Sequence, residues 1–110
     1  MITTHVLDTS LGKPGAGIAV ELERDDKGVW KLIGAGITDA DGRLKTLTAA
    51  GPLMPAHYRI RFQTGLYFAA LNVVGFFPVV EIQFTVISAS SHYHVPLLLS
   101  PFSYSTYRGS

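Results

Sequence analysis

The sequence predicts an all-β protein, a sandwich or barrel of short antiparallel strands around a single core. Apolar and polar residues alternate in three separate segments, and Gly, Pro and Asp residues typical of turns lie between the segments. Alternation with a period of two gives a strand one buried face and one wet face. Many short strands with little helix favour a sandwich or barrel over a fold of alternating strands and helices.

The alternation is clearest in residues 18–23, 58–63 and 80–86. After the first of these, Asp25 to Gly28 predicts a turn into a second strand over residues 29–38, which together make a hairpin. Three more strands are expected at residues 2–7, 92–100 and 103–108. Residues 64–71 are apolar without a period of two and predict one short helix. The chain is therefore expected to have seven or eight strands and a single helix.

The composition indicates one domain, residues 1–110, with apolar surface to spare. The chain is 47% hydrophobic and 15% charged, enough to fill a core and leave apolar residues for subunit contacts. Its net charge is +1 and its Lys and Arg residues are scattered. Nucleic acid is therefore not an expected partner, because no basic patch is present to hold a phosphate backbone.

Cysteine use and the chain ends point to the cytoplasm as the expected location. Without cysteine the chain has no disulfide and no thiolate metal site, which is compatible with a reducing compartment. The first residues show neither a basic leader nor an apolar stretch of signal-peptide length. The most apolar segment, residues 65–80, is shorter than the roughly 20 residues of a membrane span, so no membrane partner is expected.

Histidines are the groups in this sequence that titrate near neutral pH. Of the four, His92 and His94 are two apart on an expected strand and should face the same side. They could hold a metal with His5 as third ligand, but no Cys or carboxylate spacing supports that reading, and no metal site is predicted. By itself, His5 among apolar neighbours is typical of a structural residue.

Two further features have a structural and a functional interpretation. Arg43 follows an Asp-Gly turn and would ordinarily be a solvated charge at the rim of the protein. Ser110, the last residue of the sequence, would carry an ionised α-carboxylate. Residues 103–107 form strands well and would tie this end of the chain down. A serine nucleophile is disfavoured, because no Gly-x-Ser-x-Gly elbow is present.

Several segments taken together resemble the 5-hydroxyisourate hydrolases of the transthyretin-like family. They are His-Val-Leu-Asp at residues 5–8, Asp-Gly-Arg at 41–43, and the segment 92–101 with the closing Tyr-Arg-Gly-Ser at 107–110. The resemblance implies a transthyretin-like (prealbumin-like) β-sandwich of two four-stranded sheets with one short helix. It also implies a homotetramer, a dimer of dimers, with active sites at the dimer–dimer interface.

The resemblance implies an activity and a set of site residues. The activity is hydrolysis of 5-hydroxyisourate to 2-oxo-4-hydroxy-4-carboxy-5-ureidoimidazoline in urate breakdown, by histidine-assisted attack of water on a cyclic amide, with no cofactor or metal. The implied catalytic residues are His5, Arg43, His94 and Ser110. The implied substrate-binding residues are His5, Arg43, His92, Tyr107 and Ser110. Either His5 or His94 would be the general base, because the ordinary pKa of histidine, about 6.5, suits that role.

Two other functions remain open at this point. One is a transthyretin-like carrier of thyroid hormone without catalysis, and the other is a plain β-sandwich interaction module. The carrier has lysine, glutamate and threonine where this chain has His5, Arg43 and His94, and its chain continues past the position of Ser110. These differences favour the enzyme.

Overall fold

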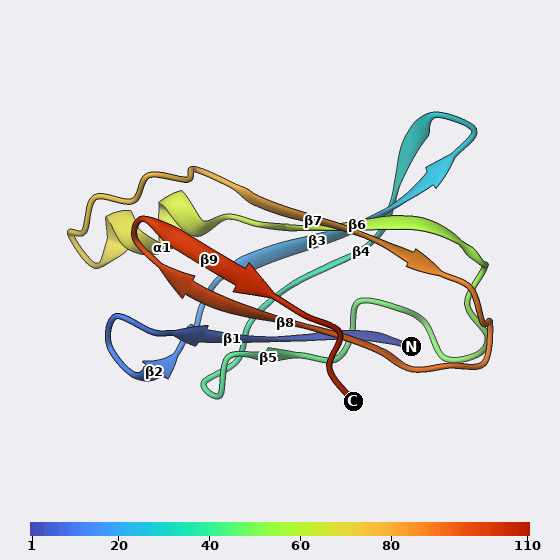
Figure 1. The fold of residues 1–110 in the computed structure, drawn as a ribbon, viewed down its shortest axis with the longest axis horizontal. Coiled ribbons are helices and arrows are strands. Elements are labelled where there is room, and N and C mark those ends of the chain that lie inside the picture. The colour runs from blue at the N-terminus through green and yellow to red at the C-terminus, as the bar shows by residue number, and fades with distance from the viewer.

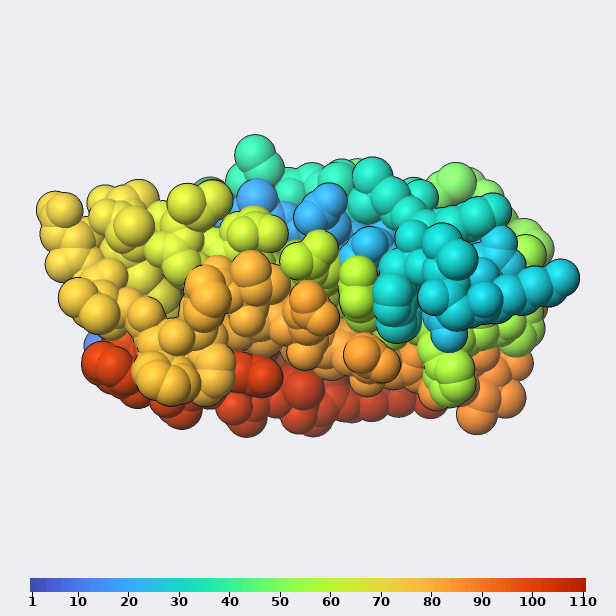
Figure 2. Space-filling view, turned by 90° about the horizontal axis from the view of Figure 1, so that it is seen from above, coloured from blue at the N-terminus to red at the C-terminus, as the bar shows by residue number.

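Two β-sheets packed face to face make up the protein in the computed structural model, which describes residues 1–110 (Figure 1). The first sheet has the order β4-β3-β6-β7 and consists of β3 (Ala19–Asp26), β4 (Val29–Ile37), β6 (Ala56–Phe62) and β7 (Val80–Val86). The second has the order β2-β1-β8-β9 and consists of β1 (Ile2–Asp8), β2 (Lys13–Pro14), β8 (Tyr93–Ser100) and β9 (Ser103–Thr106). A short strand, β5 (Arg43–Leu44), also pairs with β1. Figure 2 shows the C-terminal residues along one long side of the molecule.

The structure confirms the predicted two-sheet sandwich, with one helix, α1 (Thr64–Ala70), after β6. It adds two strands that were not predicted, β2 and β5, so that the second sheet has five strands rather than four. Each of these strands has two residues, too few to show an alternating pattern. The helix is seven residues long, and no helix of the protein is long and apolar enough to cross a membrane.

Most predicted boundaries hold to within one residue, but the end of the last strand was wrong. It was expected to reach residue 108, whereas β9 ends at Thr106. Beyond that point the chain leaves the regular ladder and returns to β8 only through an isolated bridge between Gly109 and His94. The strand expected from residue 92 begins instead at Tyr93, which leaves His92 just outside β8.

One strand pair departs from the expected antiparallel arrangement. β1 and β8 run parallel, with Thr3 opposite His94 and His5 opposite Pro96. Parallel strands need a long connection, and here most of the chain, including the whole first sheet, lies between the two. This register places the N-terminal histidine strand beside the C-terminal one.

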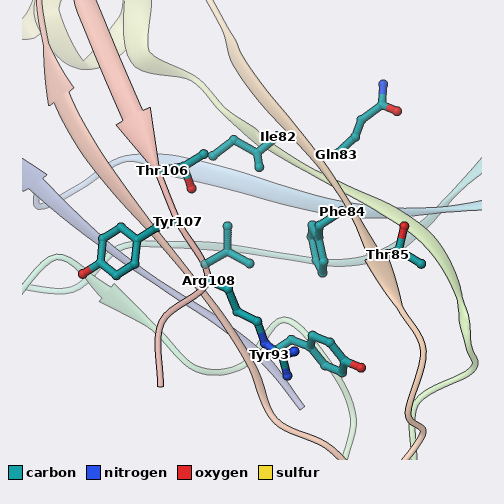
Figure 3. Close-up of a pocket in the computed structure, with 9 residues that line it drawn as sticks. Ile82, Gln83, Phe84, Thr85, Tyr93, Thr106, Tyr107 and Arg108 are labelled. Atoms are coloured by element: carbon teal, nitrogen blue, oxygen red, sulfur yellow. The ribbon is translucent and has the colours of Figure 1, made fainter.

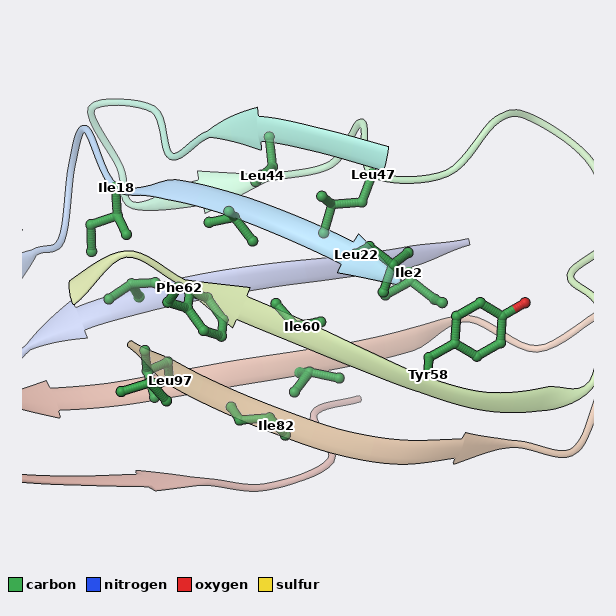
Figure 4. Close-up of a cluster of buried hydrophobic side chains, with 14 of the residues drawn as sticks. Ile2, Ile18, Leu22, Leu44, Leu47, Tyr58, Ile60, Phe62, Ile82 and Leu97 are labelled. Atoms are coloured by element: carbon green, nitrogen blue, oxygen red, sulfur yellow. The ribbon is translucent and has the colours of Figure 1, made fainter. Parts of the chain in front are cut away.

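Nineteen buried residues, most of them from the two sheets, form one core (Figure 4). The predicted alternation is confirmed, since Ile18, Val20 and Leu22 of the first alternating segment are almost completely buried. The alternating residues of β6 are buried in the same way. From the second sheet, Leu97 and Leu99 fill the core. The opposite, outward face of β1 and β8 carries the polar residues Thr3, His5 and His94 together with the apolar residues Leu7 and Leu98.

Candidate active site

Four segments distant in sequence meet on the outer face of the second sheet. There they line a cavity of about 290 Å³ whose residues are mostly polar. β1 and β8 supply its floor, the chain after the 41–42 turn supplies one wall, and the C-terminal residues supply another. The lining residues are Met1, Thr3, Thr4, Arg43, Lys45, His92, His94 and Ser110.

A fixed turn positions Arg43. The Asp39 carboxylate accepts hydrogen bonds from the backbone N–H groups of Asp41 and Arg43, each at 2.9 Å. The bond from the Arg43 backbone helps to lower the pKa of Asp39. Gly42 has a φ of +75°, and a Cβ there would lie 2.4 Å from the Val6 carbonyl oxygen. Only glycine fits this position, and the turn thereby places Arg43 opposite β1.

His94 is held from two sides. Its Nδ1 lies 2.8 Å from the Thr3 hydroxyl oxygen. On its other edge, a Cβ at Gly109 would lie 2.5 Å from the ring atom Cδ2, so this close approach requires glycine. Burial lowers the pKa of His94, and the positive charges of nearby groups, His92 first among them, lower it further. The imidazole is therefore kept neutral, the state that can take a proton.

His5 lies beside the cavity without lining it. It is two residues from Thr3 on the outward face of β1, and its backbone is paired with that of Arg43. Its Nε2 lies 2.9 Å from the Asp41 carbonyl oxygen. A carbonyl oxygen only accepts, so this bond requires the proton on Nε2 and leaves Nδ1 as the free nitrogen of the neutral ring. The same bond links His5 to the turn that positions Arg43.

The C-terminal residues reach the cavity through contacts that differ from the predicted continuous strand. The Gly109 N–H donates to the His94 carbonyl oxygen at 2.8 Å. The Arg108 guanidinium lies over the Tyr93 ring, 4.4 Å from its centroid, a favourable cation–π distance. The Tyr93 hydroxyl accepts hydrogen bonds from the backbone N–H groups of Ile87 and Ser88. Tyr93 thus fixes both the loop before His92 and the segment that delivers Ser110.

The structure brings together four of the six predicted site residues, Arg43, His92, His94 and Ser110, and places His5 next to them. Tyr107 lies elsewhere: it is 59% exposed and borders a different cavity, of about 260 Å³, between β7 and the end of β9 (Figure 3). Its part in substrate binding stays a prediction.

Sequence reasoning missed Thr3 and Lys45, which show no motif signal of their own. The neighbours of Thr3 depend on the β1–β8 register.

The histidines do not form a metal-ligand set in this arrangement. No three His, Asp or Glu side chains converge as ligands of an ion. The nearest nitrogens of His92 and His94 both face the same hydroxyl oxygen, that of Thr3. The site is thus a cluster of imidazoles and cations without a carboxylate side chain among its lining residues. Such a cavity can move protons and bind an anionic or carbonyl-rich ligand.

The two-sheet fold and this basic cavity define a small sandwich protein of the transthyretin fold. The chain belongs to the HIUase/Transthyretin family, whose model matches residues 2–109. It is 43% identical over 110 residues to a 5-hydroxyisourate hydrolase of Salmonella dublin, covering 100% of this chain and 81% of the relative.

Two solved structures show how closely the fold is shared across this family. The 5-hydroxyisourate hydrolase of Klebsiella pneumoniae superposes with a TM-score of 0.87 at 36% identity, covering 99% of this chain and 92% of that one. Sea bream transthyretin in complex with thyroxine superposes with a TM-score of 0.92 at 31% identity, covering 98% and 93%. Since both the hydrolase and the thyroxine-bound transthyretin match, the backbone does not distinguish hydrolysis from thyroxine binding. Only the side chains of the cavity can distinguish the two.

Proposed function

We propose that the protein hydrolyses 5-hydroxyisourate to 2-oxo-4-hydroxy-4-carboxy-5-ureidoimidazoline. This proposal rests on one observation: His94, whose pKa is lowered, and Arg43 line the same cavity. A neutral base beside a fixed cation is what addition of water to a carbonyl needs. Its relatives at 43% identity and its structural neighbour at 36% identity bear the name of this activity.

In the proposed reaction His94 is the general base. Its Nδ1 is engaged by Thr3 and its Cδ2 edge by Gly109, so Nε2 is the nitrogen available to a ligand. As Nε2 takes a proton from water, the oxygen bonds to the ring carbonyl carbon and a tetrahedral oxyanion forms. The carbon–nitrogen bond of the ring then breaks, and the proton passes from His94 to the departing nitrogen. Together, addition to the carbonyl and cleavage of the carbon–nitrogen bond consume one water molecule and return His94 to its starting state.

Arg43 binds the substrate and stabilises the oxyanion in this proposal. Its planar guanidinium stays protonated and offers several donors toward carbonyl and anionic oxygens. Lys45, two residues further on, adds a second positive charge to the same cavity. Ser110 and His92 border the cavity from its other sides and orient substrate or water. His5 acts from beside the cavity, by holding the turn before Arg43.

We also propose that the active protein is a homotetramer, a dimer of dimers, with the sites between dimers. Two features support this assembly. The sheets end in the edge strands β7 and β9, which are free to pair with another copy. The cavity lies on an outward sheet face, where a second copy would exclude water from the reaction. Sedimentation of the purified protein tests the tetramer, and a monomer with full activity would refute its role.

The activity is tested by ultraviolet absorbance after urate oxidation has generated 5-hydroxyisourate in the cuvette. Purified protein should accelerate decay of this compound well beyond the spontaneous rate. Decay at the buffer rate would refute the proposal.

A carrier function is the second candidate, because the TM-score to transthyretin bound to thyroxine is 0.92. Calorimetric titration with thyroxine distinguishes the two. Thyroxine binding in a protein that leaves 5-hydroxyisourate untouched would favour the carrier.

A further inference from the structure

The Thr3 hydroxyl lies between two histidines of the cavity. Its oxygen is 2.8 Å from Nε2 of His92 and 2.8 Å from Nδ1 of His94. Thr3 is only 5% exposed and lies opposite His94 in the β1–β8 pairing. The sequence gives this threonine no motif, and the reaction proposed above does not yet give it a role.

Counting protons restricts how these three groups can bond. A hydroxyl has one proton to donate, so the two imidazole nitrogens cannot both accept from Thr3. At least one of them therefore donates its own N–H to the hydroxyl oxygen, and where Thr3 donates to the other nitrogen, two arrangements are possible. In the first arrangement His92 donates to Thr3 and Thr3 donates to Nδ1 of His94. In the second, Nδ1 of His94 donates to Thr3 and Thr3 donates to Nε2 of His92.

The two arrangements differ in whether His94 can act as a base. In the first, neutral His94 carries its proton on Nε2, the nitrogen left free by Thr3 and Gly109, and cannot take another there. In the second, the proton is on Nδ1 and Nε2 has a free lone pair. After Nε2 takes a proton, the Nδ1–H bond to Thr3 persists, so the charged ring keeps the same orientation.

We propose that Thr3 is a positioning residue that fixes His94 with its proton on Nδ1 by passing its own hydroxyl proton to His92. This inference rests on the proposed hydrolysis and gives His92 a defined part in it, as the acceptor at the end of the chain. Protonation of His92 removes that acceptor. The Thr3 hydroxyl is then free to donate to Nδ1 of His94, which favours the first, inactive arrangement.

The proposal makes the acid limb of the pH profile a property of both histidines. The other titratable and charged groups near His94 are His5 on β1, Arg43 on β5, and three groups that line the same cavity: the Lys45 side chain, the Met1 α-amino group and the Ser110 α-carboxylate. These groups act on His94 through space, whereas His92 also acts through the Thr3 hydroxyl. Removal of that hydroxyl should therefore abolish the part of the coupling between His94 and His92 that the hydroxyl carries, and leave the through-space effects, including that of His92, in place.

The test compares Thr3→Val, which removes the hydroxyl at nearly equal volume, with Thr3→Ser, which keeps it. Thr3→Val should lower kcat at least about tenfold with little change in KM, since loss of the group that fixes a histidine tautomer has cost up to ~10⁴-fold elsewhere. Thr3→Ser should restore most of the rate and the wild-type pH profile. Thr9→Val is the matched control, because it removes a hydroxyl that bonds Leu99 away from the cavity, and it should leave the rate unchanged.

A second measurement does not depend on activity. Nitrogen-15 NMR of the histidine rings should show His94 of the wild type and of Thr3→Ser protonated on Nδ1 at neutral pH. His94 protonated on Nε2 in the wild type, or wild-type rates in Thr3→Val, would overturn the proposal. If the wild type fails to hydrolyse 5-hydroxyisourate while the NMR result holds, the proposed function fails and the hydrogen-bond arrangement stands. If Thr3→Val does not fold, the wild-type spectrum still shows which ring nitrogen of His94 is protonated and so tests the proposal.

Discussion

Both sheets carry a cluster of polar groups on their outward faces, but the two clusters are arranged in opposite ways. On the first sheet Arg59 donates to Glu23 at 2.8 Å, and Arg61 lies 3.1 Å from Glu81. Arg59 also lies over the Trp30 ring, 4.4 Å from its centroid. Each of these arginines has a carboxylate partner within the protomer. We call this surface the charge face.

On the second sheet the outward face carries bases and cations without carboxylate side chains among the residues lining its cavity. Burial lowers the pKa of His94, and neither Arg43 nor Lys45 forms a salt bridge with an acidic side chain. We call this surface the histidine face. Charges that are paired within the protomer stabilise it and have no free hydrogen-bonding groups for a ligand. Donors and bases without such partners can bind a ligand. The comparison therefore predicts that substitutions on one face change stability and substitutions on the other change activity.

The largest effect is expected from His94→Gln on the histidine face. Loss of the general base should lower kcat/KM between about 100-fold and 10,000-fold, with the thermal midpoint close to that of the wild type. The matched control is His57→Gln on β6, whose ring bonds the Thr85 hydroxyl on the other sheet. Measurement of kcat/KM for both variants tests this. An equal loss of kcat/KM in the two would show that the faces do not differ in function.

A smaller loss is expected from Gly109→Ala, which adds one methyl group beside the catalytic ring. The new Cβ would lie 2.5 Å from His94 Cδ2, so either the ring or the C-terminal segment has to shift. Misplacement of a reacting group by about 1 Å can cost as much as ~100-fold, and we expect about tenfold or more in kcat. Steady-state kinetics together with a crystal structure of the variant would check this. An unmoved ring with a wild-type rate would show that the close contact has no role.

Arg59→Met on the charge face should change stability without changing the rate. The side chain of Glu23 is only 14% exposed, and removal of Arg59 leaves this largely buried carboxylate with only the more distant Arg61, 3.9 Å away, as a cationic partner. We expect a loss of about 1–3 kcal/mol, seen as a lower midpoint in urea. Glu23→Gln combined with Arg59→Met should recover part of it, because no unpaired charge then remains. A fall in kcat/KM in the single variant would mean that the two faces are coupled.

The sequence predicts the fold far better than it predicts the site. Period two in the three alternating segments follows directly from burial of one strand face, and the structure confirms it at Ile18, Ile60 and Val80. The site depends instead on the parallel β1–β8 register and on β5, a strand of two residues that pairs with β1. These are long-range pairings with no local signal. His92 and His94 were recognisable by their spacing, and Arg43 and Ser110 only by family resemblance.

Thr3 and Gly109 show why the rest escaped prediction. Thr3 has no motif of its own, and Gly109 lies in the closing Tyr-Arg-Gly-Ser motif but has no reacting group. The role of each comes from contacts with the histidines of the cavity, which form only once β1 and β8 have paired. Tyr107 shows the reverse, a residue in a recognisable motif that a single protomer places in a different cavity. Motifs therefore identify reacting groups here, while the groups that orient them require the structure.

The smallest effects should appear in the pH dependence of the free energy of unfolding. The histidine face and the charge face should each affect it in a different pH range. Burial lowers the pKa of His94 below 6.5, so between its folded and unfolded pKa values the unfolded chain binds more protons than the folded protein. Stability from this source is lost as the pH falls below about 6.5. The hydrogen bond from Arg59 lowers the pKa of Glu23 below 4.5, and the stability gained there is lost only as the pH falls below about 4.5.

Urea titrations across the pH range would separate the two windows. His94→Gln should flatten the dependence just below pH 6.5 and leave the region below 4.5 as in the wild type. Glu23→Gln should do the opposite. If both variants altered the same window, the two faces would titrate as one system, and the independence of the charge face from the histidine face would have to be given up.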